Sequence, residues 1–265
     1  MQPGPVIGMV LALGAILVGN ALEGGHASAM VGGPAALIVF GGTIGAVLVQ
    51  YPFPTCTAAM RAALATFKPP PQDPGALVDE IAGYAQQARR DGILSLEKVS
   101  ETASDPFLRK ALTMAVNGSD SQSLRETLEV AISQEEEHGE DGAKVFEAAG
   151  GYSPTIGIVG AVLGLIHVMT NLSDMAAVGT GIAAAFVATI YGVAMANIVA
   201  LPLGGRIKLR VREQANVREM TLVGVLAIQS GMNPKLLRER LAEFIPHHGS
   251  AKAPSTAAVP TRAPS

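Results

Sequence analysis

Two apolar segments lie close together in the chain. They read YSPTIGIVGAVLGLIHVMTNL at residues 152–172 and VGTGIAAAFVATIYGVAMANIVALPL at residues 178–203. Neither contains Lys, Arg or Glu, and a short polar break at Ser173 and Asp174 separates them. Each is at least about 20 residues long, which is enough for a helix to cross a hydrocarbon core of about 30 Å. The pair therefore predicts a transmembrane hairpin over residues 152–204.

Small side chains recur at every third or fourth position in both segments. They are Gly157, Gly160, Ala161 and Gly164 in the first segment, and Gly181, Ala185, Thr189, Gly192 and Ala196 in the second. This spacing puts small residues on one face of each helix, where backbones can approach closely in lipid, which gives helices little hydrophobic drive to associate. We expect tight helix packing here. The glycines do not predict a nucleotide-binding loop, because no Lys-Ser/Thr pair follows them.

Two further apolar runs cover Val6–Leu22 and Gly33–Val49, with a short loop between them. No Lys or Arg precedes the first run, and a second run follows within a dozen residues, so we interpret it as a retained span and not as a signal peptide. Residues 1–51 are thus expected to form a first transmembrane hairpin. The fold prediction is all-α, with four transmembrane helices and a helical cytoplasmic domain between the second and third.

Basic residues indicate the orientation of these spans. Every Lys and Arg lies between Arg61 and Lys144 or from Arg206 onward, and the loops at residues 24–31 and 173–178 contain none. Because cytoplasmic loops carry the excess of Lys and Arg, both termini and the insertion at residues 52–151 are expected in the cytoplasm. A helical extension is predicted at residues 205–246, followed by a disordered Pro-, Ala- and Ser-rich tail at residues 247–265.

The composition excludes several classes of function. The 265 residues are 49% hydrophobic and 15% charged, with a mean hydropathy of +0.35, which is typical of a polytopic membrane protein with a soluble insertion. A net charge of −3 argues against a nucleic-acid partner, and the single cysteine, Cys56, excludes an intrachain disulfide. No catalytic, metal-binding or cofactor-binding motif is present, and the acidic run at residues 135–141 is interpreted as a solvated face. The chain is not expected to be an enzyme.

A few polar residues and prolines stand out in the predicted spans. Thr189 lies mid-helix on the small-residue face, where its hydroxyl either lines a narrow wet path or bonds back to its own helix. His167 is either a packed or wetted histidine or a proton relay. Pro154 is expected near a helix start. Pro202 removes a helical hydrogen bond and is expected to kink its helix, and such a kink could serve as a hinge.

The segments GYSPTIGIVGAVLGLIHVM and GIAAAFVATIYGVAMANIVALPL resemble the third and fourth transmembrane helices of flagellar motor stator proteins in the MotA/TolQ/ExbB proton channel family. The resemblance extends to ARRDGILSLE at residues 88–97 and, in layout, over about residues 1 to 245. It implies that the chain conducts ions, and protons are favoured over sodium because Ala161 falls where sodium-driven relatives tend to carry Thr. It further implies that Thr189 faces the ion path and that Pro154 and Pro202 couple ion passage to conformational change.

The resemblance also implies partners. Arg89 and Glu97, with Arg90 beside them, match the cytoplasmic charges that engage the switch protein of the rotor. The family works in the bacterial inner membrane as a homopentamer around a dimer of MotB-like subunits, each of which supplies a membrane Asp. The residues independently point to such a partner, because harvesting the roughly 2.3 kcal/mol that a proton releases over 100 mV requires a group that binds and releases it. No predicted span of this chain contains a carboxylate.

Two other functions stay open at this point. A TolQ- or ExbB-like subunit that energises the cell envelope would normally have three spans and lack the first hairpin. A small-solute transporter would often place paired ionisable groups at the membrane midplane and show repeated halves. Neither paired ionisable groups nor repeated halves are evident in this sequence, and four spans are predicted. A stator subunit is therefore the favoured interpretation.

Overall fold

The computed structural model describes residues 3–69 and 73–245, and over these ranges the chain is helical with no β-strand. Four helices in the described part are long and apolar enough to cross a membrane. The prediction of an all-α protein with four transmembrane helices is therefore confirmed. The predicted tail at residues 247–265 lies outside the described residues.

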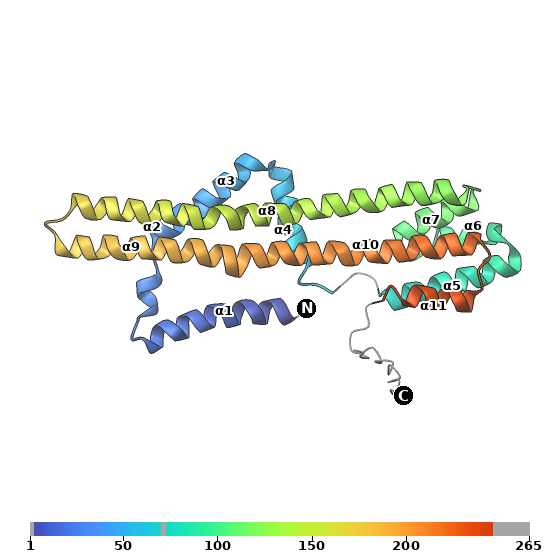
Figure 1. Cartoon of the computed structure of the whole chain (residues 1–265), viewed down its shortest axis with the longest axis horizontal. Helices are drawn as coiled ribbons and strands as arrows, with labels where there is room; N and C mark the ends of the chain where they lie inside the picture. Colours follow the sequence, from blue (N-terminus) through green and yellow to red (C-terminus); the bar gives the residue numbers. More distant parts are fainter. Residues whose placement is uncertain (1–2, 70–72, 246–265) are drawn as a thin grey trace, which may run out of the picture.

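Two long antiparallel rods form the axis of the molecule (Figure 1). One rod is α8 (Ser121–Thr170), and the other runs without a break through α9 (Met175–Ala194), the π-helix η4 (Met195–Ala200) and α10 (Leu201–Gln229). At 1.5 Å per residue, the 50 residues of α8 extend for about 75 Å, more than twice the thickness of a hydrocarbon core. Each rod therefore crosses the membrane and continues beyond it.

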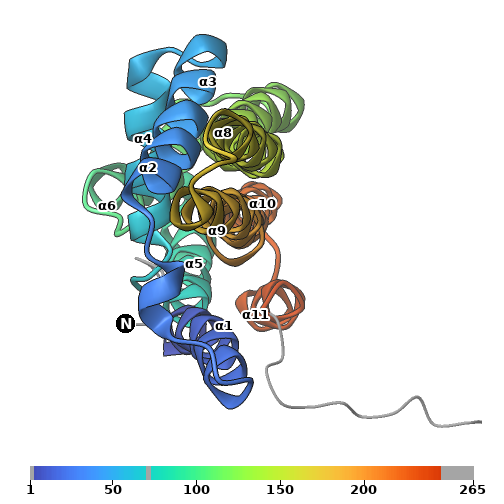
Figure 2. The same cartoon turned by 90° about the vertical axis from the view of Figure 1, so that its left-hand side faces the viewer.

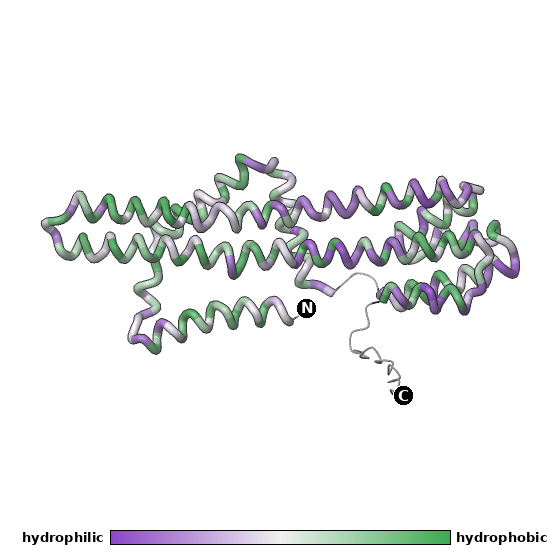
Figure 3. Tube along the Cα trace, viewed as in Figure 1, coloured by the Kyte–Doolittle hydropathy of each residue, from purple (hydrophilic) through white to green (hydrophobic). Residues whose placement is uncertain are grey.

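Hydropathy divides the molecule along these rods (Figure 3). We call residues 4–50 and 152–203 the apolar half and residues 53–151 and 204–245 the polar half. The boundary predicted between residues 151 and 152 falls inside α8, so one uninterrupted helix belongs to both halves. A movement at one end of such a helix can be carried to the other end through its backbone.

The two prolines occupy different positions from those expected. Pro154 lies inside α8, so the expectation that it sits near a helix start is wrong. Its missing N–H breaks one helical hydrogen bond, and the packing of α8 against α9 and η4 holds the helix together across that gap. Pro202 lies in the first turn of α10, directly after η4. The irregularity that we expected at Pro202 is thus found in the π-helical turn before it.

The first two spans lie on different sides of the rods (Figures 1 and 2). α1 (Pro3–Leu22) has none of its apolar stretch buried. The second span consists of α2 (Gly33–Ala36), the π-helix η2 (Leu37–Gly41) and α3 (Gly42–Gln50), and it packs on α8 and α9. α1 and the second span therefore do not close on each other as a packed hairpin, and α1 is left for lipid or another chain to cover.

α4 (Phe53–Ala65) follows the second span and leads into the polar half. Its buried residues Ala59 and Ala63 belong to a small core with Ala143 and Phe146 of α8 and Ile207 of α10. These alanines face α8 and α10, which lets α4 lie close to both rods.

The polar half has a core of large aliphatic side chains. It is assembled from α5 (Pro74–Asp91), the 3-10 turn η3 (Ile93–Leu96), α7 (Pro106–Val116) and α11 (Pro234–Ala242), packed against α8 and α10. The short helix α6 (Glu97–Ser100) packs on α7 beside this core. Its fully buried members include Ile81, Leu96, Leu108, Leu112, Leu124, Leu128, Val225, Leu237 and Leu241. Burial of each such side chain contributes about 1.5–3 kcal/mol relative to exposure, so this half is stabilised mainly by the hydrophobic effect.

Local sequence signals place the helix starts in this half. Asp105 and Asn233 each precede a proline, and their side chains accept hydrogen bonds from the backbone N–H groups of Leu108 and Lys235. A short polar side chain at the N-cap followed by proline in the first turn satisfies orphan donors and fixes the backbone for helix entry. The sequence thus determines where α7 and α11 begin.

Candidate functional site

Glycines form the contact between α8 and α9. A Cβ atom on Gly157 would lie 2.9 Å from the carbonyl oxygen of Ala188, and one on Gly164 would lie 2.9 Å from that of Gly181. A Cβ atom on Gly192 would lie 2.5 Å from the carbonyl oxygen of Ser153. Real Cβ atoms do not approach backbone atoms so closely, so no other residue fits at these positions without moving a helix. The small-residue faces predicted from the sequence meet along this line, which we call the glycine seam.

A hydrogen bond joins the two helices at one end of the seam. Ser153 is fully buried, and its hydroxyl donates to the carbonyl oxygen of Gly192 at 3.1 Å. Ser153 was not among the functional residues predicted from the sequence. Its spacing of four residues before Gly157 is the signal that could have placed it on the seam.

Thr189 lies at the edge of the seam and is half-buried. Its hydroxyl donates to the carbonyl oxygen of Ala185 at 3.2 Å, so of the two alternatives left open by the sequence, bonding back to its own helix is the one observed. This bond uses the single proton of the hydroxyl, and the oxygen keeps lone pairs that can still accept a hydrogen bond. The residue therefore remains able to interact with a water molecule or an ion-binding group beside it.

The other predicted membrane residues are only partly brought together. A Cβ atom on Gly192 would lie 3.2 Å from the Cα atom of Pro154, and one on Gly157 would lie 3.5 Å from the Cα atom of Thr189. Pro154 and Thr189 therefore flank the same crossing of α8 and α9. Ala161 lies two turns further along α8 and is half-buried. Pro202 is exposed, ten residues beyond Gly192, which is about 15 Å along the helix.

Tyr191 ties the second span to α9. Its hydroxyl donates to the carbonyl oxygen of Met30 at 2.7 Å and accepts from the backbone N–H of Gly32 at 3.2 Å. Its ring stacks on Phe40 with centroids 5.7 Å apart. This role of Tyr191 was not predicted from the sequence, although a tyrosine deep in an apolar run indicates that its hydroxyl has a partner.

The predicted charged contact lies at the end of the molecule opposite the α8–α9 loop (Figure 1). Gly92 ends α5 with a φ angle of +85°, a conformation that other residues rarely adopt, and turns the chain from α5 into η3. Arg89 and Glu97 are exposed on either side of this turn, and neither makes an ion pair among the residues that the structure describes. Both charges are available to a partner.

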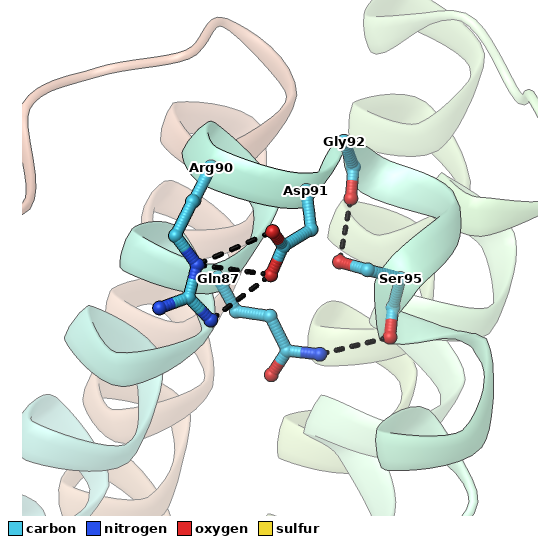
Figure 4. A network of polar contacts seen from close by, with 5 residues as sticks. All are labelled: Gln87, Arg90, Asp91, Gly92 and Ser95. Atoms are coloured by element: carbon cyan, nitrogen blue, oxygen red, sulfur yellow. Dashed lines mark hydrogen bonds and ion pairs between the residues drawn. The ribbon is translucent and has the colours of Figure 1, made fainter.

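Arg90 differs from Arg89 because it has a partner within the chain. Its guanidinium donates to the carboxylate of Asp91 through Nε and Nη2, at 3.0 Å for the Nη2 contact (Figure 4). The hydrogen bond and the opposite charge of Asp91 raise the pKa of Arg90 above its ordinary value. Arg90 thus stays charged, but part of its hydrogen-bonding capacity is already used. The sequence had grouped it with Arg89 and Glu97 without this distinction.

Two hydrogen bonds hold the turn itself (Figure 4). The side-chain amide of Gln87 donates to the carbonyl oxygen of Ser95 at 2.9 Å, and the hydroxyl of Ser95 donates to the carbonyl oxygen of Gly92 at 2.6 Å. Gln87 was not predicted from the sequence, because nothing local indicates a contact eight residues ahead across a turn. These bonds fix the backbone between Arg90 and Glu97. We call residues 89–98 the charged tip.

A second polar cluster braces α5 against the start of α7. The Glu80 carboxylate accepts hydrogen bonds from the hydroxyl and backbone N–H of Ser104 and from the Tyr84 hydroxyl, the last at 2.6 Å. Burial alone would raise the pKa of Glu80, but these hydrogen bonds together outweigh it and lower the pKa. The pKa of Tyr84 is raised by burial and by its bond to Glu80. This cluster helps to hold the charged tip in place.

No grouping of three or more His, Cys, Asp or Glu side chains in residues 3–69 and 73–245 is placed to hold a metal ion. In the acidic run, Glu135 pairs with Arg218, and Asp141 pairs with Lys144 at 2.9 Å. The described arrangement thus offers a closely packed helix pair in the apolar half and a charged tip, held by hydrogen bonds, in the polar half.

Comparison with known proteins gives a consistent result over more than nine-tenths of the chain. Residues 6–90 match the model of the motility protein A N-terminal family, and residues 99–220 match that of the MotA/TolQ/ExbB proton channel family. Motility protein A of Bacillus subtilis is 33% identical over 247 residues, covering 93% of this chain and 92% of that protein. Chemotaxis protein PomA of Vibrio alginolyticus is 31% identical and covers 84% and 87%, respectively.

Solved structures show the same likeness. The chain superposes on the C. jejuni MotAB structure with a TM-score of 0.89 and 30% identity, covering 94% of this chain and 97% of that one. For the flagellar MotAB stator complex of Bacillus subtilis the TM-score is 0.84 and the identity 33%, covering 91% and 95%.

Proposed function

Because this chain belongs to the MotA/TolQ/ExbB proton channel family, we propose that it is the ion-conducting stator subunit of a bacterial flagellar motor. It couples ion flow across the membrane to torque on the rotor. The observation that carries this proposal is the match over nearly the full length, both in sequence and in structure, to motility protein A and to MotAB stator complexes. The match includes the first two spans and the polar half.

The partner is a MotB-like subunit with a single membrane span that supplies an ion-binding Asp. Two observations support it. The structures that this chain resembles are MotAB complexes. In addition, residues 4–22, 33–50, 152–170 and 175–203 contain no Asp or Glu, so the group that binds and releases the ion must come from another chain. We further propose five copies of this chain around two copies of the partner, an arrangement that would cover the exposed apolar side chains of α8 and α9.

We also propose that the protein lies in the inner membrane with both termini in the cytoplasm. The support is the distribution of Lys and Arg, which leaves the loops at residues 24–31 and 173–178 without a basic residue. Cysteines introduced at Ser28 and Ser173 should react with a membrane-impermeant reagent in intact cells, and one introduced at Ser104 should react only after lysis. Protection of position 173 in intact cells would contradict this topology.

The ion path is proposed to run beside Thr189 and Ala161, with Pro154 and Pro202 coupling ion passage to movement of the rods. The position of Pro154 and Thr189 at the same helix crossing supports this, because an ion bound there would act directly on the glycine seam. Protons are proposed as the ion, on the basis of Ala161. Motility should then fall with a protonophore and persist when sodium is depleted. Motility that depends strictly on sodium would overturn that choice.

Arg89 and Glu97 are proposed to contact the switch protein of the rotor, with Arg90 contributing less because Asp91 already binds it. Exposed charge pairs are worth about 0–1 kcal/mol each, so neutralising one should weaken torque without abolishing it. Arg89→Glu should impair rotation more, since it turns attraction into repulsion. Compensating reversals on the rotor should restore it. If the double variant Arg89→Glu with Glu97→Lys recovers full motility with an unchanged rotor, the two residues form an intrachain pair instead.

The proposed function is tested by deleting the gene in a motile host. We expect cells that build flagella but do not rotate them, recovery when the full chain is restored, and co-purification of a single-span partner with a membrane Asp. A deletion strain that swims normally but loses energised uptake across the envelope would replace the stator function by the TolQ- or ExbB-like alternative.

A further inference from the structure

We propose that Leu94 is the apolar anchor by which the charged tip seats on its rotor partner. This inference rests on the proposed function and goes beyond it, because neither the resemblance nor the sequence pattern assigns a role to Leu94. The partner it fits is a protein surface with an apolar socket, flanked by acidic groups opposite Arg89 and Arg90 and by a basic group opposite Glu97.

The first support is the exposure of Leu94. Its side chain is 69% exposed, whereas Leu96, two residues later in the same turn, is fully buried in the core of the polar half. The turn therefore points one leucine inward and one outward. Burying the exposed leucine in a partner would remove apolar surface from water, which is the main source of affinity at the centre of protein interfaces.

The second support is that the turn is already fixed before any partner binds. Gly92 supplies the left-handed conformation, the Ser95 hydroxyl closes the turn onto Gly92, and Gln87 fastens Ser95 to α5 (Figure 4). A contact residue carried on a preformed turn loses little conformational entropy on binding. A leucine on a freely moving loop would have to be ordered first, at a cost to affinity.

The third support is the charge around the leucine. Arg90 precedes it by four residues and Glu97 follows it by three, and Lys98 is also exposed. An apolar centre with a polar rim is the usual layout of a protein interface. The charges alone are screened within about 8 Å at physiological salt and bring little affinity. An apolar anchor would supply the affinity, and charges of both signs would set the orientation.

The experiment compares Leu94 with a matched leucine. A single exposed leucine is ordinary on a protein surface. Leu236 on α11 is 58% exposed in the same half of the molecule and has no role in the proposed contact. The full chain carrying Leu94→Asp, Leu94→Met, Leu236→Asp or no change is expressed with its partner in a strain that lacks the native gene. Torque-generating units per motor are counted from speed steps of a bead on a flagellum, and membrane amount and co-purified partner are measured in parallel.

We expect Leu94→Asp to lower the number of engaged units at least about tenfold at unchanged membrane amount and partner content, a fold-change that corresponds to the loss of about 1.4 kcal/mol at a central anchor. Leu94→Met and Leu236→Asp should behave as the unchanged chain. A photo-reactive amino acid at position 94 should crosslink to a rotor protein in rotating cells.

Equal numbers of engaged units for Leu94→Asp and the unchanged chain would overturn the inference while leaving the proposed function intact. A crosslink from position 94 to a second copy of this chain would overturn it as well. Leu94 would be assigned to folding if Leu94→Asp lowers the amount of protein in the membrane and the photo-reactive residue at position 94 gives no crosslink to a rotor protein. Failure of the proposed function itself would be seen separately, as normal rotation in the deletion strain.

Discussion

The two halves of this molecule are both helical but are held together in opposite ways. In the apolar half, α8 and α9 meet through glycines and through a hydrogen bond from Ser153 to Gly192. In the polar half, α5, α7, α10 and α11 meet through large aliphatic side chains such as Leu108 and Leu112. The same two rods, α8 and α9–α10, run through both halves.

The solvent explains this difference. Water drives large apolar side chains together, so the polar half gains stability from the volume that it buries. Lipid tails are as apolar as leucine, so helices in the apolar half gain stability from close backbone approach and hydrogen bonds. The same change in side-chain volume is therefore expected to have opposite consequences in the two halves. Adding atoms should damage the seam, and removing atoms should damage the core.

The largest effect is expected for Gly192→Val at the seam. The new Cβ atom would lie 2.5 Å from the carbonyl oxygen of Ser153 and 3.1 Å from the Cα atom of Gly157, and neither backbone can move without separating the rods. We expect complete loss of assembled complex in membrane extracts analysed by size-exclusion chromatography. Gly179→Val, on the same helix with no neighbour within 4 Å, serves as the control. Assembly of the Gly192 variant at normal levels would show that the seam is not tightly packed.

A smaller effect is expected for Leu108→Ala in the core of the polar half. Leu108 is fully buried, and removing such a side chain costs about 2–5 kcal/mol through lost transfer energy and the cavity left behind. Thermal unfolding of the purified complex should shift downward, and motility should fail at elevated temperature first. Leu236→Ala, at an exposed position, should leave the transition unchanged. If both variants behave alike, the polar half is not stabilised by this core.

Thr189→Val tests whether the edge of the seam has a role besides packing. The substitution keeps the shape and removes one hydrogen bond to Ala185, which is worth about 0.5–1.5 kcal/mol or less within a single helix. We expect normal membrane assembly with reduced swimming in soft agar, because the hydroxyl would no longer be present beside the ion path. Thr180→Val, whose hydroxyl also bonds back to its own helix, is the matched control. Normal swimming of the Thr189 variant would remove this residue from the mechanism.

The smallest effect is expected for Glu80 and depends on pH. Its pKa is lowered on folding, so the hydrogen-bonded carboxylate contributes stability above its ordinary value of 4.5, and that contribution is lost as the pH falls through the folded value. Glu80→Gln should lower stability by about 1 kcal/mol near neutral pH. The difference in melting temperature from the unchanged chain should shrink below pH 4.5. A difference that stays constant with pH would show that the charge of Glu80 does not contribute.

Patterns local in the chain determined much of this protein. The apolar runs predicted the four spans because their length and lack of charge admit few other arrangements. Residues such as Gly157 and Gly192 predicted the seam because helical spacing alone puts them on one face. Asp105 and Asn233, each followed by proline, determined helix starts.

Only the tertiary structure decided those features that depend on contacts between residues far apart in the chain. Pro154 was expected at a helix start, but packing against α9 and η4 carries α8 through it. The partners of Ser153, Tyr191 and Gln87 lie on other elements or across a turn, so no local pattern announced them. The outward direction of Leu94 and the inward direction of Leu96 likewise depend on the core that the turn packs against. Local backbone preference sets each helix, but the pairing of helix faces is set by shape and solvent across the whole fold.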